Sequence, residues 1–171
     1  MTTVDTEVKN IDTLYNEKDE DTQKDKFLTF QLESESYGIE IRHVTEIVAI
    51  QKITALPDVP EYTMGLINLR GKIIPVIDVR IRFHLSQREY DHRTCIIVVN
   101  IHNNTVGLIV DSVQEVSNID KSEIESPPLK NDTQGDFLRG LGKVGKEVKI
   151  LLDVEKLLFG EELEQNETLI N

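Results

Sequence analysis

Side chains that commonly carry catalysis or bind metals are few in this sequence, and they do not cluster. No metal-ligand spacing joins the four histidines, which are His43, His84, His92 and His102. Cys95 opens the apolar run Cys-Ile-Ile-Val-Val, so we expect a buried and unreactive thiol there. Neither residue type predicts a metal site or a nucleophile.

Asp78 and Asp153 are the remaining pair that could act together as an acid and a base. Each follows an apolar run and precedes a few residues of helical character, at equivalent places in two halves of the chain. A carboxylate at that place is typical of a helix N-cap, where it accepts hydrogen bonds from the first backbone amides. The sequence therefore predicts no catalytic residue, no cofactor and no metal, and we do not expect an enzyme.

Arg70 has the setting that most favours binding. It stands beside Gly71, directly before the apolar run Ile73–Ile77, which predicts a cation on a loop next to a buried strand. Loops held by a rigid framework are where binding residues concentrate. Two compatible hypotheses stay open for its guanidinium, namely a contact with a partner molecule and an ion pair with a nearby acid such as Glu46.

These residues are positioned by an internal repeat. A shift of 69 residues lays Leu28–Val48 on Ile97–Ser117 without a gap, and a shift of 75 lays Gly65–Val79 on Gly140–Val154. The apolar pattern is the same in both copies. Two diverged copies, each with roughly five short strands, predict two similar small β-barrels or sheets packed together.

The repeat also separates what the fold needs from what one copy uses. Two pairs of glycines recur, Gly38 with Gly107 and Gly65 with Gly140. Recurrence indicates positive φ or a close backbone approach at these positions. Arg70 instead falls on Gly145, so nothing in the repeated unit requires a guanidinium there. This difference favours a contact between Arg70 and a partner.

Strands dominate the expected elements. The runs Phe27–Leu32 and Tyr37–Ile41 predict a β-hairpin. The turn His-Asn-Asn-Thr at residues 102–105 predicts another, because Asn tolerates positive φ. Helices should be short, and we expect them over Asp58–Met64, Asp132–Arg139 and Asp153–Phe159.

The net charge of −12 is unevenly distributed over the 171 residues. Residues 1–26 carry eight acids and four bases, and residues 161–171 carry four acids and no base. We expect an acidic, disordered arm over 1–26, a single domain over 27–160 and an acidic tail over 161–171. The mixed charges of the domain argue against nucleic acid or an anionic membrane as a partner.

The sequence also bears on the compartment. Its single cysteine cannot form an intramolecular disulfide, and its longest apolar strings, such as Val106–Val110, have the length of a strand. Signal peptides and membrane spans need longer apolar runs. We therefore expect a cytoplasmic protein that does not insert into a membrane.

Five segments together resemble the CheW family, the adaptors that couple chemoreceptors to the histidine kinase CheA in bacterial chemotaxis. They are residues 37–41 (YGIEI), 44–47 (VTEI), 65–80 (GLINLRGKIIPVIDVR), 106–111 (VGLIVD) and 138–142 (LRGLG). The similarity extends from about Phe27 to Phe159. The combination is highly specific, although no one of the segments would be.

The resemblance implies a fold, partners and a site. The implied fold is mainly β, with two SH3-like five-stranded barrels around a shared hydrophobic core, and it carries no catalytic activity. The implied partners are the cytoplasmic tip of methyl-accepting chemoreceptors, the CheW-like regulatory domain of CheA, and other adaptor copies in the membrane-associated receptor array. A groove between the barrels, lined by Val44 and Val116 and rimmed by Arg70 and Glu46, would suit a receptor helix. The receptor-facing positions implied by motif are Val44, Glu46, Gly65, Arg70, Gly107 and Val116.

Two other functions stay open at this point. A CheW-like adaptor of a different chemosensory system, such as one that controls pilus motility, would have nearly the same sequence. A small-molecule-binding β-barrel is the alternative from another class, and it would need a polar cluster that points into a pocket. We find no such cluster in the sequence.

Overall fold

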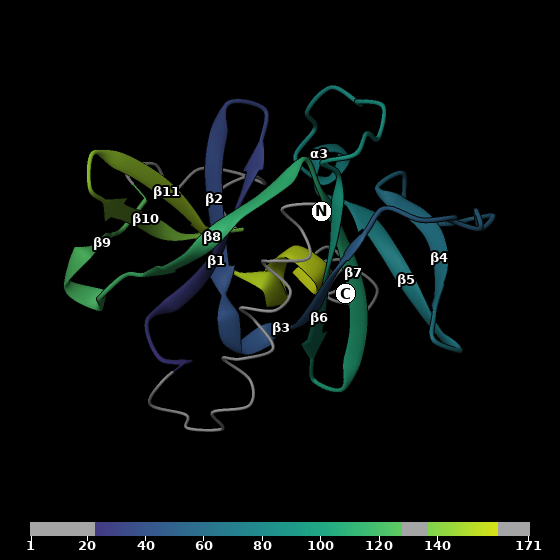
Figure 1. The fold of residues 1–171 in the computed structure, drawn as a ribbon, viewed down its shortest axis with the longest axis horizontal. Helices are drawn as coiled ribbons and strands as arrows, with labels where there is room; N and C mark the ends of the chain where they lie inside the picture. Colours follow the sequence, from purple (N-terminus) through teal and green to yellow (C-terminus); the bar gives the residue numbers. More distant parts are fainter. Residues whose placement is uncertain (1–22, 128–136, 161–171) are drawn as a thin grey trace, which may run out of the picture.

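The computed structural model of the protein describes residues 23–127 and 137–160. Within these residues the chain forms two β-sheets that lie side by side, with the helix of residues 154–160 between them (Figure 1). Most of the predicted acidic arm, residues 1–22, and the predicted tail, residues 161–171, lie outside the described residues. The proposed domain boundaries therefore stay predictions.

The first sheet has six strands in the order β8-β1-β2-β11-β10-β9. Their bounds are β1 Lys26–Leu32, β2 Glu35–Glu40, β8 Ser112–Asn118, β9 Ile124–Glu125, β10 Leu138–Val144 and β11 Glu147–Leu152. All neighbouring strands are antiparallel except β11 and β2, which are parallel. The predicted hairpin is confirmed as β1 and β2, although β1 begins inside the predicted arm.

The second sheet has five strands in the order β3-β6-β7-β5-β4. Their bounds are β3 Val44–Ala49, β4 Thr63–Leu69, β5 Lys72–Asp78, β6 Cys95–Ile101 and β7 Asn104–Val110. Here β5 and β7 are the parallel pair. The predicted turn between β6 and β7 is confirmed, with positive φ at both His102 and Asn103.

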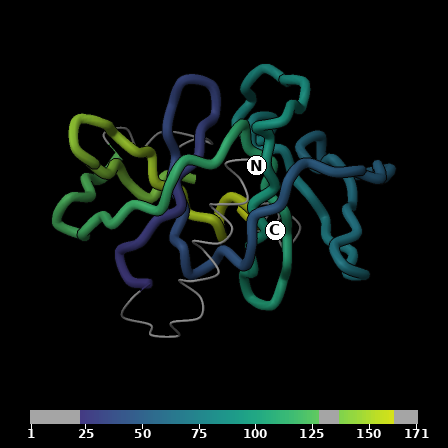
Figure 2. Tube along the Cα trace, in the orientation of Figure 1, coloured from purple at the N-terminus to yellow at the C-terminus, as the bar shows by residue number. Residues whose placement is uncertain are grey.

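The repeat is confirmed, and the two copies exchange a strand. The third strand of the first copy, β3, pairs with β6 of the second, whereas β8 of the second copy pairs with β1 of the first. Figure 2 shows the chain crossing between the two halves in both directions. The short helix η1, Ile41–His43, lies between β2 and β3 and redirects the chain toward the other half. Each sheet is thus completed by the other copy.

Alternation along the strands divides the apolar side chains among three clusters. On β6, Ile97 and Val99 face the core that both sheets share, whereas Ile96 and Val98 face a smaller cluster within the second sheet. Phe27 packs in a matching cluster within the first sheet, with Ile119 and Leu151. Neighbouring side chains on a strand point to opposite faces, so β6 is buried on both sides. The expected fold class, mainly β with two SH3-like units around a shared core, is confirmed, although the units are sheets of six and five strands where two five-stranded barrels were expected.

Helices are short, and two of the three expected ones are wrong where the structure describes them. The segment Asp58–Met64 is a turn, with φ of 54° at Asp58, and β4 begins at Thr63. Part of the second lies outside the described residues, and its end forms β10. In both places pairing between neighbouring strands outweighs the weak helical preference of a short segment. The third expected helix is confirmed by residues 154–160.

Two further helical turns follow strands. These are α3, Val79–Arg82, and η2, Lys121–Glu123. The predicted N-caps are confirmed, because a carboxylate oxygen of Asp78 accepts from the Arg80 amide at 2.9 Å and one of Asp153 accepts from the Lys156 amide at 3.2 Å. In the part of the chain that the structure describes, no helix has the length and apolar content to cross a membrane.

Candidate functional site

Arg70 lies in the tight turn that joins β4 to β5. Its φ is 51° and that of Gly71 is 85°, so both central residues have the positive φ that a type I′ hairpin turn requires. The Asn68 side chain supports the turn, since its Oδ1 accepts a hydrogen bond from the Gly71 amide at 2.8 Å. The prediction of a cation on a loop held by strands is confirmed.

The guanidinium of Arg70 forms an ion pair with Glu46 of β3. Its Nη2 lies 2.6 Å from Oε1 and 2.5 Å from Oε2 of that carboxylate. The Arg70 side chain is 74% exposed and that of Glu46 is 20% exposed, so a charged rim faces solvent. The predicted ion pair is confirmed, and it orients the guanidinium while leaving most of its surface open.

This ion pair also explains how the second sheet curls. Glu46 belongs to β3 at one edge of the sheet, whereas Arg70 follows β4 at the other edge. Contact between them requires the edges to approach each other. A bulge at Thr45 helps to set the position of Glu46, and the Thr45 hydroxyl donates to the Val98 carbonyl at 3.1 Å. Side chains therefore join edges that no strand pairing links in the described residues.

The two valines predicted to line the groove differ in exposure. Val44 is fully buried, pairs with Val99 and packs in the shared core. Val116 is half-buried, pairs with Leu28 and packs against the same core from β8. Only Val116 can offer side-chain surface to a partner in this conformation, while Val44 supports the strand that carries Glu46.

Gly65 and Gly107 are buried positions that the backbone requires. A Cβ on Gly65 would lie 2.1 Å from the Thr54 carbonyl oxygen, and one on Gly107 would lie 2.7 Å from Val76 Cγ1. Their counterpart Gly140 is similarly crowded, with Ile124 Cγ2 at 2.6 Å, whereas a Cβ on Gly38 would lie 3.0 Å from the end of the Leu151 side chain. The structural reading of these glycines is confirmed, so a substitution there would act through the fold.

Comparison with known proteins decides the family. Residues 26–162 match the family model of the CheW-like domain. The chain is 38% identical to the chemotaxis protein CheW of Klebsiella aerogenes over 144 residues, which cover 84% of this chain and 87% of that protein. The chain belongs to the CheW family. It is also 32% identical to the CheW of Treponema pallidum over 145 residues, 82% of this chain and 85% of that one.

A solved structure of the CheW family agrees with the fold. It is the crystal structure of the scaffolding protein TtCheW from Thermoanaerobacter tengcongensis, which superposes with a TM-score of 0.73 at 41% sequence identity. The match covers 78% of this chain and 91% of the TtCheW chain. The family of chemotaxis scaffold proteins is thus supported by both sequence and fold.

Other groups in this CheW-family chain have structural roles. Cys95 is buried, as predicted, and its thiol donates to the Arg93 carbonyl at 3.1 Å. His102 lies 2.9 Å from Glu155 on the exposed surface. Burial lowers the pKa of His43, with a further contribution from neighbouring Arg42. No three His, Cys, Asp or Glu side chains within residues 23–127 and 137–160 could hold a metal ion.

Sequence reasoning missed two buried arginines that join the halves of this CheW-family fold. Arg80 pairs with Asp111 through Nε at 2.6 Å and Nη2 at 2.7 Å, and its Nη1 pairs with Glu33 at 2.5 Å. The Arg82 guanidinium lies 4.5 Å from the ring centroids of both Tyr62 and Phe137. The 75-residue shift could have identified both arginines, because it lays them on non-cationic residues of the other copy.

Proposed function

We propose that this chain is a non-catalytic adaptor that couples methyl-accepting chemoreceptors to the histidine kinase CheA. As an adaptor it would hold receptor and kinase together in the membrane-associated array, so that the state of the receptor controls the kinase. Membership of the CheW family supports the scaffold role. The likeness to a solved scaffolding protein supports it further.

The exposed Arg70–Glu46 pair is the observation that carries the receptor site. A partner that offers a carboxylate could bind the open side of the guanidinium, which Glu46 already orients. Val116, half-buried on β8, would add apolar surface to the receptor site. We assign Val44, Gly65 and Gly107 a supporting role, because each is buried and fixes a strand next to the rim.

Co-sedimentation with receptor-bearing membranes tests the proposal. The full chain is added to these membranes with and without CheA, and autophosphorylation of the kinase is followed in the same samples. We expect the chain to sediment with both partners and receptor-dependent activity of the kinase to require it. Absence of binding to receptors and kinase of the same organism would contradict the proposal and favour an adaptor of a different chemosensory system.

An Arg70→Glu variant tests the site itself. Reversing the charge places a carboxylate beside Glu46 and should weaken receptor binding by roughly 1–3 kcal/mol, with the fold retained. Lys146→Glu is the matched control, since Lys146 is exposed and lies in the equivalent turn between β10 and β11. Equal receptor affinity of the two variants, measured by titration, would remove Arg70 from the site.

A further inference from the structure

A cationic pocket of about 550 Å³ lies in the first half of the molecule, away from the proposed receptor site. It is formed where β1, η1, η2 and β10 begin and where β2 ends. Five cationic side chains line it, namely Lys24, Lys26, Arg42, Lys121 and Arg139. The only carboxylates among its lining residues are those of Asp25 and Glu40. An excess of positive charge is unusual on a chain whose net charge is −12.

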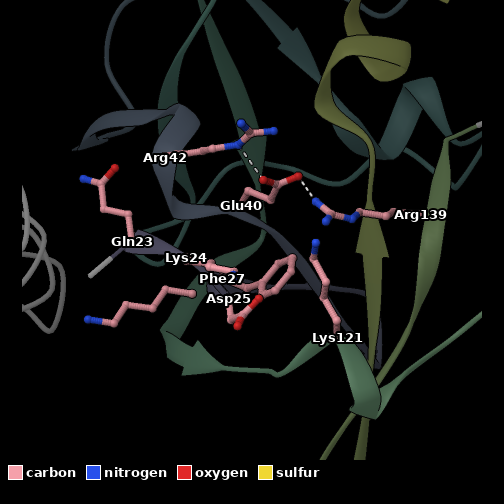
Figure 3. Close-up of a pocket in the computed structure, with 9 residues that line it drawn as sticks. Gln23, Lys24, Asp25, Phe27, Glu40, Arg42, Lys121 and Arg139 are labelled. Carbon is pink, nitrogen blue, oxygen red and sulfur yellow. Dashed lines mark hydrogen bonds and ion pairs between the residues drawn. The ribbon is translucent and has the colours of Figure 1, made fainter. Parts of the chain in front are cut away.

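Arg42, Arg139 and Lys121, which come from separate elements, gather near Glu40 (Figure 3). Glu40 lies between two guanidinium groups, 2.5 Å from Nε of Arg42 on one side and paired with Arg139 on the other. The Arg139 guanidinium also lies 5.7 Å from the centre of the Phe27 ring. The Lys121 amine points toward the Arg139 guanidinium (Figure 3). Two carboxylates cannot neutralise five cations, so the pocket attracts a further anion.

In the second half of the molecule, the place that corresponds to this pocket is covered by another segment of the chain. There, the segment that precedes β6 lies over the end of the sheet. Arg88 Nη1 lies 3.5 Å from Asp111 Oδ2, and the Tyr90 hydroxyl donates to Asp78 at 2.8 Å. A segment of the chain just before the first strand of a repeat can therefore fold back onto that repeat.

The register of the repeat holds up to the first described residues. The Asp25 carbonyl accepts from the Ile119 amide at 2.7 Å, just as the Thr94 carbonyl accepts from the Ile50 amide at 3.4 Å. The two bonds are related by the 69-residue shift. Asp25 and Thr94 are therefore structural counterparts, and the same shift aligns the sequence before β1 with the sequence before β6.

The same shift exchanges the two charges of an ion pair. It lays Arg88 on Asp19 and Asp111 on Arg42, so a cation and an anion trade places between the copies. Asp19 belongs to the acidic run of residues 17–21, which has the sequence Glu-Lys-Asp-Glu-Asp and ends two residues before Gln23. Gln23 itself lines the pocket. Two residues span at most about 7 Å, so the chain connects this run to a pocket-lining residue over no more than that distance.

We propose that the acidic run of residues 17–21 binds the cationic pocket of its own chain, with Asp19 facing Arg42 as Arg88 faces Asp111. This run lies outside the described residues, and its charge, its position and the repeat identify it as the occupant. The contact gives the N-terminal acidic arm a role, which is to neutralise the charge of the cationic pocket. It does not depend on the proposed adaptor function, because the pocket and the receptor site share no residue.

Zero-length cross-linking of the full, unmodified chain tests this proposal. A carbodiimide joins a carboxylate to an amine only when the two are in contact, and mass spectrometry then identifies the linked peptides. We expect residues 17–21 to be linked to Lys121, which is distant in sequence, and the link to disappear in 1 M NaCl, where charges are screened beyond about 3 Å. Lys72 and Lys143, both exposed and outside the pocket, are the controls.

Exchanging the charges of residues 19 and 42 makes the test specific. Arg42→Asp should reduce the Lys121 link several-fold, and adding Asp19→Arg should restore it, because the pair then has the signs found in the second half. Circular dichroism during heating confirms that both variants are folded. A mixture of isotopically light and heavy protein separates links within a chain from links between chains.

Four results would overturn the proposal. The first is a link to Lys72 or Lys143 as strong as that to Lys121, and the second is a Lys121 link that neither salt nor Arg42→Asp reduces. A dominant link from residues 161–171 to Lys121 would make the C-terminal tail the occupant. Links found only between light and heavy chains would make it a second copy.

Discussion

Arg70 combines an unfavourable backbone conformation with an exposed charge. A residue with a Cβ is strained by about 1–2 kcal/mol at positive φ, whereas glycine is not. The equivalent position in the second copy is Gly145, with φ of 62° and open space around it. The second copy thus shows a less strained solution for the same turn. An arginine retained at such a position is consistent with a binding role, because strain that the fold does not need is concentrated at functional sites.

Replacing Arg70 by asparagine should therefore separate stability from binding. Asn-Gly is the preferred pair for a type I′ turn, so Arg70→Asn relieves strain while it removes an exposed ion pair worth less than about 1 kcal/mol. We expect the free energy of unfolding to stay within about 1 kcal/mol of the original value, or to rise, while receptor binding weakens. Urea denaturation and co-sedimentation measure the two quantities.

Asn103→Gly is the control for this substitution. Asn103 also has positive φ, 66°, and lies in the turn between β6 and β7. Glycine there should stabilise the fold slightly and leave receptor binding unchanged. If Arg70→Asn instead cost more than about 2 kcal/mol, the guanidinium would be serving the fold, and its assignment to the receptor site would lose its main support.

Among the elements, the cluster of Arg80, Asp111 and Glu33 joins the two sheets, because Arg80 and Asp111 follow neighbouring strands of the second sheet and Glu33 belongs to the first. Arg80 lies in α3, Asp111 lies between β7 and β8, and Glu33 lies in the turn between β1 and β2. The side chains of Arg80 and Asp111 are 7% and 9% exposed. Burial acts to raise the pKa of Asp111, but hydrogen bonds from Arg80 and from the Glu33 amide outweigh it and hold the pKa below its ordinary value. The carboxylate is therefore ionised and paired near neutral pH.

This lowered pKa predicts how stability depends on pH. A carboxyl group whose pKa is lower in the folded state contributes stability above its unfolded pKa, and the contribution is lost as pH falls through the folded value. Asp111→Asn should cost about 1.5–3 kcal/mol near pH 7, since Glu33 still pairs with Arg80. The difference from the original protein should persist down to about pH 5 and shrink below about pH 4.

Urea denaturation of both proteins between pH 7 and pH 3 measures this difference. A destabilisation that is equally large at pH 7 and pH 3 would mean that the charge of Asp111 is not what matters. The loss of a neutral hydrogen bond or a packing defect would then be the cause.

Among the secondary-structure elements, the strands could be predicted from the sequence, whereas the short helices could not. Alternating apolar residues and the repeat identified the hairpins, because both signals extend over several residues. The helix expected over Asp58–Met64 rested only on Pro60 and on Gly65 as a stop. Gly65 is instead needed where β4 passes close to the Thr54 backbone. A glycine that permits a close approach looks the same in sequence as one that ends a helix.

For the site, comparison of the two copies favoured Arg70, and an ion pair with Glu46 was one of the two hypotheses for its side chain, but the burial of Val44 was not predicted. Burial depends on which face of β3 meets the shared core, and a bulge at Thr45 interrupts the alternation that would show it. The cationic pocket was missed for a similar reason. Its cations come from four separate parts of the chain, and Arg139 joins the others because β10 belongs to the first sheet through β11.

The exchange of β3 and β8 predicts that the two halves unfold as one unit. β1 needs β8 from the second copy and β6 needs β3 from the first, so neither half contains all the strands of its own sheet. The shared core, with Leu28 of β1 and Ile97 of β6, adds contacts between the sheets. Independent unfolding of one half would leave a sheet of the other without an edge strand.

A core substitution in one half should therefore destabilise both halves equally. Leu151 is fully buried and packs with Phe27 and Ile119 in the first sheet, outside the apolar cluster of the second. Leu151→Ala should cost about 2–5 kcal/mol through the cavity it leaves. In native-state hydrogen exchange, the slowest amides of β6 and β7 should lose the same protection as those of β1 and β2. If protection fell only in the first sheet, each half would open separately despite the exchanged strands, and the halves would be two units that pack together.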